Sequence, residues 1–297
     1  MTKPVAVRGG HFSVAGHQLA YELYGDAGTP CVLVHGILLD SLLNRDLAVR
    51  FAAAGYQVAL LDLLGHGHSA KPNDPKEHRV DFYADQLLAL MDHLGWERAL
   101  IGGISLGAMT SITAAAKAPE RVIGLFLEMP VMEWSAPWAA VILAPMLVAT
   151  RYGGLLYRRF ARLMARLPRP RSAWMASGMN AFSADPRIVA AILHGVLVGP
   201  MVPPVAVRRT LQMPTLIIGH WGDKLHEYRD ARALAQQLPN ARLLSAKHIL
   251  ELRTQPSRLW PEIARFLDQV RTASPAPHAA TRSHAAGPAA RRRRSDH

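Results

Sequence analysis

The stretch "IGGISLGAM", residues 101–109, places a serine between two glycines in the pattern G-x-S-x-G. The apolar run "ALIGG" leads into it, and a helical pattern, "LGAMTSITAAAKA", follows at residues 106–118. Gly103 and Gly107 permit a sharp turn from strand to helix, since no Cβ crowds the backbone at either position. Such a turn pushes the hydroxyl of Ser105 out at the end of a sheet. The stretch therefore predicts an exposed serine nucleophile rather than a simple glycine-rich turn.

Short apolar runs alternate with longer helical patterns along the rest of the chain. Six runs are compact enough for buried strands, at residues 31–35, 56–62, 98–105, 121–129, 214–220 and 241–246. Between them, stretches such as 81–95 and 229–239 repeat apolar residues every three or four positions, as amphipathic helices do. This alternation predicts an α/β fold with a doubly wound, mainly parallel sheet and helices on both faces.

The alternation breaks once, between residues 131 and 207, where the pattern is helical and rich in proline and methionine. A helical insertion between two strands of one sheet is the economical interpretation. We therefore expect a core formed by residues 1–130 and 208–271 and a helical cap at 131–207. Residues 272–297, rich in Ala, Pro, Ser and Arg, predict a disordered basic tail.

Within the insertion, "LLYRRFARLMARL" at residues 155–167 carries an apolar stripe and a stripe of arginines spaced by four. The apolar stripe consists of Leu156, Phe160, Leu163, Met164 and Leu167, and the arginines are Arg158, Arg162 and Arg166. The pattern favours an amphipathic helix packed on the domain. A membrane-surface helix and an arginine-lined approach to an anionic substrate remain open.

Composition limits the class of protein. Half of the 297 residues are apolar, which suffices for a substantial core, and the single cysteine, Cys31, excludes an internal disulfide. The N-terminal sequence lacks the continuous apolar block of a secretory signal, so we expect a cytoplasmic protein. The longest apolar run, residues 135–150, is too short to span a bilayer and contains Pro137 and Pro145, so stable membrane insertion is not expected.

The formal net charge is +12, and much of it lies in the predicted tail, which holds five arginines and one aspartate. We interpret the four consecutive arginines there as a solvated run rather than a nucleic-acid contact. The other basic residues do not interleave with aromatic residues in a recognisable motif, so no nucleic-acid partner is expected.

Three segments together resemble the α/β-hydrolase family, and the resemblance covers about residues 10–270. "LVHGILLDS" at 33–41 resembles the family's segment after its third strand, and "LDLLGHGHSAKP" at 61–72 resembles its Asp-x-x-Gly-His-Gly-x-Ser segment after the fourth. "GGISLG" at 102–107 is similar to its nucleophile elbow. The family's helical lid, inserted after the sixth strand, would correspond to residues 131–207.

The resemblance assigns a structural role to the His-Gly dipeptide. It implies an oxyanion hole made by the backbone N–H groups of Ile37 and Leu106, with His35 shaping the loop and Gly36 allowing close approach. His66 and His68 fit a turn after a strand rather than metal ligands. Neither a metal nor another cofactor is expected.

A serine nucleophile needs a base and an acid, and the family's chain order is serine, acid, histidine. The resemblance places Asp223, after the run at 214–220, as the acid and His248, after the run at 241–246, as the base. Lys224 and Lys247 stand where the family commonly has Pro and Gly. His226, three residues after Asp223, is the alternative base, and Glu128 is the alternative acid.

A serine at the elbow disfavours haloalkane dehalogenase and epoxide hydrolase chemistry, for which the resembling enzymes use an aspartate. Hydrolysis of a small-molecule carboxylic ester through an acyl-enzyme is the leading hypothesis, with thioester or carbon–carbon bond hydrolysis as alternatives. A catalytically silent binding protein on the same fold is the alternative from another class.

Candidate substrate contacts lie in the cap. Its methionines and tryptophans, including Trp134 and Trp138, suggest an apolar moiety in the substrate. Seven arginines and no acidic residue between Trp134 and Ala184 weakly favour a substrate that also carries a carboxylate, such as a half ester. Arg158 and Arg162 are the arginines we expect to contact it.

Overall fold

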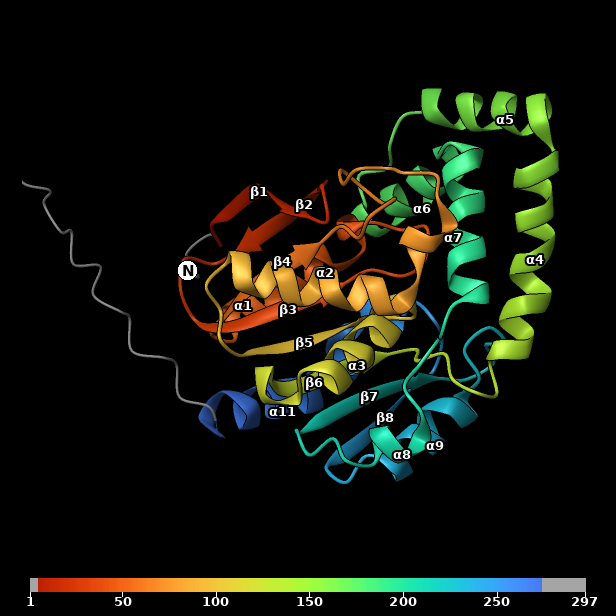
Figure 1. Ribbon diagram of the computed structural model, residues 1–297. Coiled ribbons are helices and arrows are strands. Elements are labelled where there is room, and N and C mark those ends of the chain that lie inside the picture. Colours follow the sequence, from red (N-terminus) through yellow and green to blue (C-terminus); the bar gives the residue numbers. More distant parts are fainter. Residues whose placement is uncertain (1–4, 274–297) are drawn as a thin grey trace, which may run out of the picture.

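The computed structural model describes residues 5–273. Its centre is an eight-stranded sheet with the strand order β1-β2-β4-β3-β5-β6-β7-β8 (Figure 1). The strands are β1 (Val7–Val14), β2 (His17–Tyr24), β3 (Thr29–Val34), β4 (Tyr56–Leu61), β5 (Ala99–Ile104), β6 (Val122–Glu128), β7 (Thr215–His220) and β8 (Ala241–Ala246). Strand β2 pairs antiparallel with β1 and β4, whereas the other neighbours are parallel. The predicted α/β fold with a mainly parallel sheet is confirmed.

The six predicted strands correspond to β3 through β8, and β1 and β2 were not predicted. Strand β1 lies at the edge of the sheet and exposes most of its residues, whereas every residue of β3 is buried. An exposed edge strand needs no continuous apolar run. The antiparallel pair therefore lacks the signal that identifies the buried strands.

Helices cover both faces of the sheet. The helices are α1 (Arg45–Ala53), α2 (Val80–His93), α3 (Leu106–Lys117), α4 (Ala136–Tyr152), α5 (Gly154–Arg166), α6 (Ala173–Ser183), α7 (Pro186–Val198), α8 (Val205–Arg208), α9 (Tyr228–Gln237), α10 (Glu251–Thr254) and α11 (Trp260–Ala273). Short 3-10 turns occur at η1 (Ser41–Asn44), η2 (Pro75–His78), η3 (Pro119–Arg121) and η4 (Pro256–Arg258).

Two hydrophobic clusters lie on opposite faces, because successive side chains of a strand point to opposite sides. In β3, Val32 and Val34 pack with α2, α3 and α9, whereas Cys31 and Leu33 pack with α1 and α11. Cys31 is fully buried. The sheet is thereby held rigidly between two helical layers, which fixes the strand ends that carry the site.

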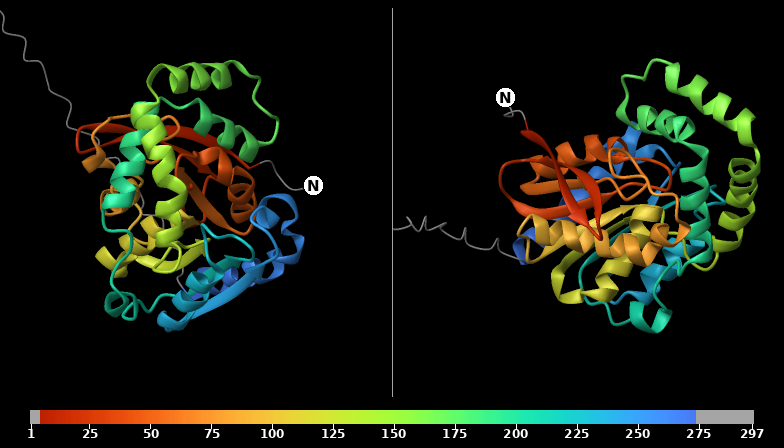
Figure 2. Two further views of the ribbon diagram at one scale, coloured as in Figure 1. Left: turned by 90° about the vertical axis from the view of Figure 1, so that its right-hand side faces the viewer. Right: turned by 45° about the horizontal axis from the view of Figure 1, so that its top comes forward.

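Helices α4 to α8 lie between β6 and β7, as the predicted insertion requires. Figure 1 shows α4, α5, α6 and α7 at one end of the sheet, whereas the short α8 lies apart from them and contacts α3. We use "cap" for α4 to α7 and retain 131–207 as a proposed boundary. The two views of Figure 2 show the same four helices along one side of the molecule.

Helix α5 does not pack as expected. Its buried residue is Ala161, while the apolar stripe is mostly open to solvent, with Leu156 78% and Leu163 56% exposed. The prediction that this stripe packs on the domain is therefore wrong. Ala161 is buried against the rest of the cap and the ring of Phe160 meets that of Phe182 of α6 edge-on, whereas Leu156 and Leu163 remain outside.

Within residues 5–273, none of the helices is both long and apolar enough to cross a membrane by itself. Two sharply bent pairs, α4 with α5 and α6 with α7, reach that length and composition only jointly. The predicted basic tail falls outside the described residues, apart from Thr272 and Ala273, which belong to α11.

Candidate active site

Ser105 lies in a tight turn between β5 and α3. Its φ of 53° and ψ of −112° belong to a region that non-glycine residues rarely adopt and that occurs at nucleophile sites. A Cβ at Gly103 would lie 2.3 Å from the carbonyl oxygen of Val34, and one at Gly107 would lie 2.2 Å from the same oxygen. Both glycines are therefore needed because the end of β3 passes directly beside the turn.

A chain of hydrogen bonds leads from Ser105 to Asp223 through His226. The Oγ of Ser105 lies 2.9 Å from Nε2 of His226, and Nδ1 of His226 lies 2.6 Å from Oδ2 of Asp223. Because a carboxylate only accepts, Nδ1 carries the proton and Nε2 faces the serine hydroxyl as an acceptor. This is the arrangement of nucleophile, base and orienting acid in a catalytic triad.

The local sequence explains how two residues only three positions apart can pair. Oδ1 of Asp223 accepts from the backbone N–H of Leu225 at 2.9 Å and from that of His226 at 3.3 Å, which folds the segment back on itself. Burial raises the pKa of the Asp223 carboxyl, yet hydrogen bonds from the His226 ring and these N–H groups outweigh it, so the pKa lies below its ordinary value. Asp223 therefore stays ionised beside the imidazole.

The prediction that His248 lies against Ser105 is wrong in this structure. The His248 side chain is exposed, and its backbone carbonyl accepts a hydrogen bond from Nδ1 of the buried His220 at 3.0 Å. Glu251, the first residue of α10, fixes the same loop, because its carboxylate accepts from the N–H of Lys247 and pairs with Arg258. These contacts fix the loop with its backbone inward and the His248 ring outward.

Glu128, the alternative acid, contacts neither Ser105 nor His226 through its side chain. It is buried in an ion pair with Arg253, and its Oε1 lies 3.5 Å from Nε2 of His220. Burial raises the pKa of Glu128, but the charge of Arg253 and the contact with the His220 ring outweigh it and lower the pKa to about 2. Only its backbone serves the elbow, since its carbonyl accepts from the N–H of Ser105 at 2.9 Å.

His35 has the structural role expected of it. The ring is fully buried, with Nδ1 donating to the carbonyl of Gly36 at 2.8 Å and Nε2 accepting from the N–H of Leu63 at 3.1 Å. It thus ties the loop after β3 to the loop after β4. Gly36 lies against the nucleophile, because a Cβ there would be 3.8 Å from Cβ of Ser105.

A small apolar cavity of about 30 Å³ opens at the nucleophile. It is lined by Ile37, Ser105, Leu106, Met109, Val131, Ala139, Leu143, Val196, Leu197, Met201 and Leu225. A cavity of this volume has room for only one or two water-sized molecules, so we expect the cap to shift when a substrate enters. The cavity walls come from both the core and the cap, and they carry no charged side chain.

None of the four predicted substrate contacts lines this cavity. Trp134 and Trp138 are 54% and 39% exposed at the base of the cap, and Arg158 and Arg162 lie on the outer helix α5 beside residues 183–186. Spacing along a helix indicates which residues share a face, but it does not say which way that face points. The structure therefore does not place Arg158 or Arg162 at the cavity beside Ser105.

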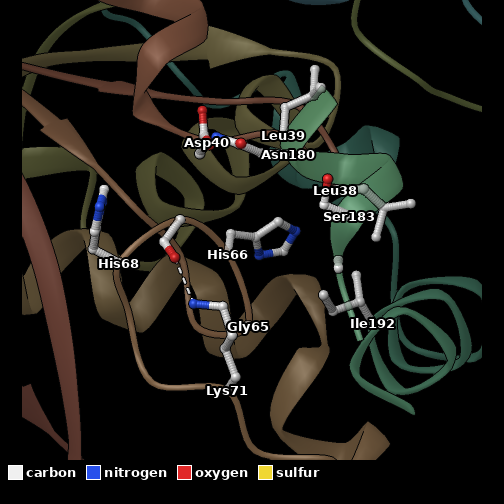
Figure 3. Close-up of a pocket in the computed structure, with 12 residues that line it drawn as sticks. Leu38, Leu39, Asp40, Gly65, His66, His68, Lys71, Asn180, Ser183 and Ile192 are labelled. Carbon is white, nitrogen blue, oxygen red and sulfur yellow. Dashed lines mark hydrogen bonds between the residues drawn. The ribbon is translucent and has the colours of Figure 1, made fainter. Parts of the chain in front are cut away.

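A larger hollow of about 310 Å³ is lined in part by the loop after β3 (Figure 3). Its walls carry Leu38, Leu39, His66, Lys71 and Ile192, among others. Burial lowers the pKa of His66 well below its ordinary value, so the ring is neutral. Nδ1 of His66 donates to the carbonyl of Leu64 at 3.0 Å, which is the behaviour of a turn residue.

The sequence did not reveal how the base of the cap is joined to the catalytic segment. Asp230, in the first turn of α9, is fully buried and accepts from three backbone N–H groups, those of Met132 at 2.9 Å, Trp134 at 3.0 Å and Ser135 at 2.8 Å. Ser135 Oγ in turn accepts from the N–H of Glu227, at 2.8 Å. An aspartate near a helix start is commonly read as a capping residue, so no local signal marks this contact.

Two cation–π contacts reinforce the same junction. The ammonium of Lys224 lies 4.7 Å from the centre of the Trp138 ring, and the guanidinium of Arg229 lies 4.9 Å from that of Trp134. Lys224 lies within the segment that carries Asp223 and His226, and Arg229 follows that segment by three residues. The cap therefore contributes to holding His226 over Ser105.

Replacing Asp230 with asparagine is expected to weaken this junction. One amide oxygen replaces a carboxylate that serves three buried N–H groups, so we expect a loss of about 2–4 kcal/mol in unfolding free energy and lower turnover of an ester. Urea denaturation and steady-state kinetics measure the two effects. Asp26→Asn is the matched control, because its side chain is 73% exposed. Equal stability of the two variants would show that the junction contributes nothing.

Comparison with known proteins agrees with the fold. The α/β hydrolase fold family model matches residues 29–186. The chain belongs to the α/β-hydrolase fold family.

Similar proteins share parts of the chain. Lipase 1 of Psychrobacter immobilis is 28% identical over 225 residues, which cover 71% of this chain and 67% of the lipase. The dihydrolipoyllysine-residue acetyltransferase component of the acetoin cleaving system of Pseudomonas putida is 44% identical over 108 residues, but these cover only 36% of this chain and 28% of that protein.

Solved structures resemble most of the chain. The enol-lactonase from Burkholderia xenovorans LB400 has a TM-score of 0.70 at 21% identity, covering 87% of this chain and 100% of the lactonase. A thermophilic esterase from Thermogutta terrifontis has a TM-score of 0.67 at 25% identity, covering 88% and 97%. The lactonase likeness establishes the fold and not the substrate.

Proposed function

We propose that the protein hydrolyses a neutral carboxylic ester with an apolar moiety, through an acyl-enzyme on Ser105. The observation that carries the proposal is the hydrogen-bonded chain from Ser105 Oγ through His226 to Asp223. His226 accepts the hydroxyl proton as Oγ attacks the ester carbonyl, and later donates it to the departing alcohol. A water activated by the same imidazole then releases the acid. Asp223 orients the ring and stabilises its charged form.

Two backbone N–H groups beside Ser105 support the proposal of an oxyanion hole. Leu106 is the first residue of α3, so its N–H has no acceptor within the helix. Among the described residues, the structure shows no hydrogen-bond acceptor for the N–H of Ile37. Both residues line the cavity with Ser105, and the positive end of the α3 dipole points into it. We propose these two groups as the oxyanion hole.

The chemistry of the cavity favours an uncharged, apolar substrate portion. Its lining from the cap consists of aliphatic side chains of α4 and α7, including Ala139, Leu143 and Val196. A carboxylate there would lose its hydration without gaining a charged partner. The half-ester alternative thus has no support from the cavity. Two similar proteins are named lipases, which agrees with ester hydrolysis.

Turnover of a substrate panel tests the proposal. We expect p-nitrophenyl esters to be hydrolysed, with a higher kcat/KM for medium acyl chains than for acetate, since a longer chain buries more apolar area. A neutral diester should be preferred over the matching half ester. Hydrolysis of thioesters or carbon–carbon bonds without ester hydrolysis would contradict the reaction class. Binding of apolar esters without any turnover would identify a silent binding protein.

A further inference from the structure

The outer surface of the cap exposes large apolar side chains on two adjoining helices. We define this outer cap face by Val141, Val148, Tyr152, Leu155, Leu156, Phe160, Leu163 and Leu167, all of which are exposed. Tyr152 and Leu156, at the corner between α4 and α5, are 79% and 78% exposed. Figure 1 shows α4 and α5 along the outer edge of the molecule, and Figure 2 shows them there from two further directions.

The residues that α5 contributes to the outer cap face follow helical spacing, so they share one face of that helix. Leu156, Phe160, Leu163 and Leu167 of this face are separated by four, three and four positions. An exposed apolar surface of this kind on a water-soluble domain commonly marks an interaction site. Spacing alone does not identify the partner.

The charge around the outer cap face indicates the kind of partner. The segment from Trp134 to Ala184 contains seven arginines and no aspartate or glutamate. Within residues 5–273, none of these arginines lies within ion-pair distance of a carboxylate. Arg159 and Arg166 lie one turn on either side of Leu163, so cations border the apolar stripe directly.

A second copy of the chain fits this face poorly, because a symmetric contact would place the arginines of one copy opposite those of the other. An anionic phospholipid surface satisfies both features. Its head groups pair with the arginines, and its acyl boundary accepts the apolar stripe. We propose that the outer cap face docks the protein on an anionic membrane surface, lying on the bilayer without crossing it.

This docking bears on the active site without depending on the proposed reaction. Helix α4 lines the cavity at Ser105 with Ala139 and Leu143, while Val141 and Val148 of the same helix belong to the outer cap face. A lipid contact on the outside of α4 thus acts on a helix that also forms a wall of the cavity at Ser105. Membrane binding can be measured with no substrate present, so its failure and the failure of ester hydrolysis are separate results.

Co-sedimentation of the full chain with vesicles tests the proposal. We expect binding to vesicles of equal parts phosphatidylglycerol and phosphatidylcholine, and little binding to phosphatidylcholine alone. Arg159→Glu with Arg166→Glu should lower the partition coefficient about 25-fold or more, since each basic residue near an anionic surface is worth about fivefold. Leu156→Ser with Leu163→Ser should lower it about tenfold or more without affecting the charge.

The matched control reverses two arginines elsewhere. Arg98 and Arg232 are exposed on the core, outside the cap, so Arg98→Glu with Arg232→Glu changes the net charge equally. We expect it to change partitioning by less than about twofold, because charges beyond a Debye length are screened. Circular dichroism checks that all variants fold.

Three results would overturn the proposal. The first is a wild type that fails to sediment with anionic vesicles. The second is an equal loss of binding in the two arginine double variants, which would indicate attraction by net charge alone. The third is a wild-type dimer in sedimentation equilibrium that Leu156→Ser with Leu163→Ser converts to a monomer. That result would identify a second copy as the occupant of the outer cap face.

Discussion

Ester hydrolysis by Ser105→Ala is expected to fall roughly four to six orders of magnitude below that of the wild type. The variant loses the covalent route entirely, while binding and oxyanion stabilisation remain and leave a residual rate. Steady-state assays with a p-nitrophenyl ester measure the loss. A fluorophosphonate probe should label the wild type at Ser105 and leave the variant unlabelled.

Ser111→Ala is the matched control for this substitution. Ser111 is buried in the same helix, α3, and its hydroxyl donates to the carbonyl of Gly107 at 2.8 Å. This variant should stay active even if it is slightly less stable. The proposed mechanism fails if Ser105→Ala retains near wild-type turnover, or if the probe modifies a different residue.

His226→Ala is expected to cost about as much activity as Ser105→Ala, because nucleophile and base act as one unit. The double variant should therefore be no slower than either single variant. Asp223→Asn should retain more activity, since the imidazole remains in place while its orientation and charge stabilisation are lost. Comparison of kcat for the four proteins measures these relations.

His248→Ala provides the control within the same experiment. Its ring is exposed and only its backbone contributes a hydrogen bond, so we expect its kcat within about threefold of the wild type, the range usual for a surface substitution. An inactive His248→Ala enzyme together with an active His226→Ala enzyme would refute the assignment. The reacting conformation would then place the loop after β8, and not the segment after β7, over the serine.

The elbow and the buried strands could be predicted from the sequence because their causes are local. Gly103 and Gly107 are required where the backbone turns beside β3, and a strand buried on both faces must be apolar throughout. The family resemblance indicated Asp223 as the acid, and the structure places its carboxylate against the ring of His226. Strands β1 and β2 carried no such signal, because one side of that pair faces solvent.

The choice between His226 and His248 needed the tertiary structure. Both follow strands whose carboxyl ends lie side by side in β7 and β8, so the sequence places either ring near Ser105. The decision comes from long-range backbone contacts. His220 turns the His248 carbonyl inward, whereas Asp230 joins the base of the cap to the segment that carries His226.

The direction in which a helix faces was likewise decided only by packing. The sequence by itself determined that α5 has an apolar stripe and a basic stripe, because helical spacing is a property of the chain. Whether the stripe with Leu156 and Leu163 points to the core or to solvent depends on what the helix contacts. The contact through Ala161 leaves Leu156 and Leu163 outside, and it leaves Arg158 and Arg162 away from the cavity at Ser105. Local order follows from local sequence, but orientation follows from the surfaces that the rest of the fold presents.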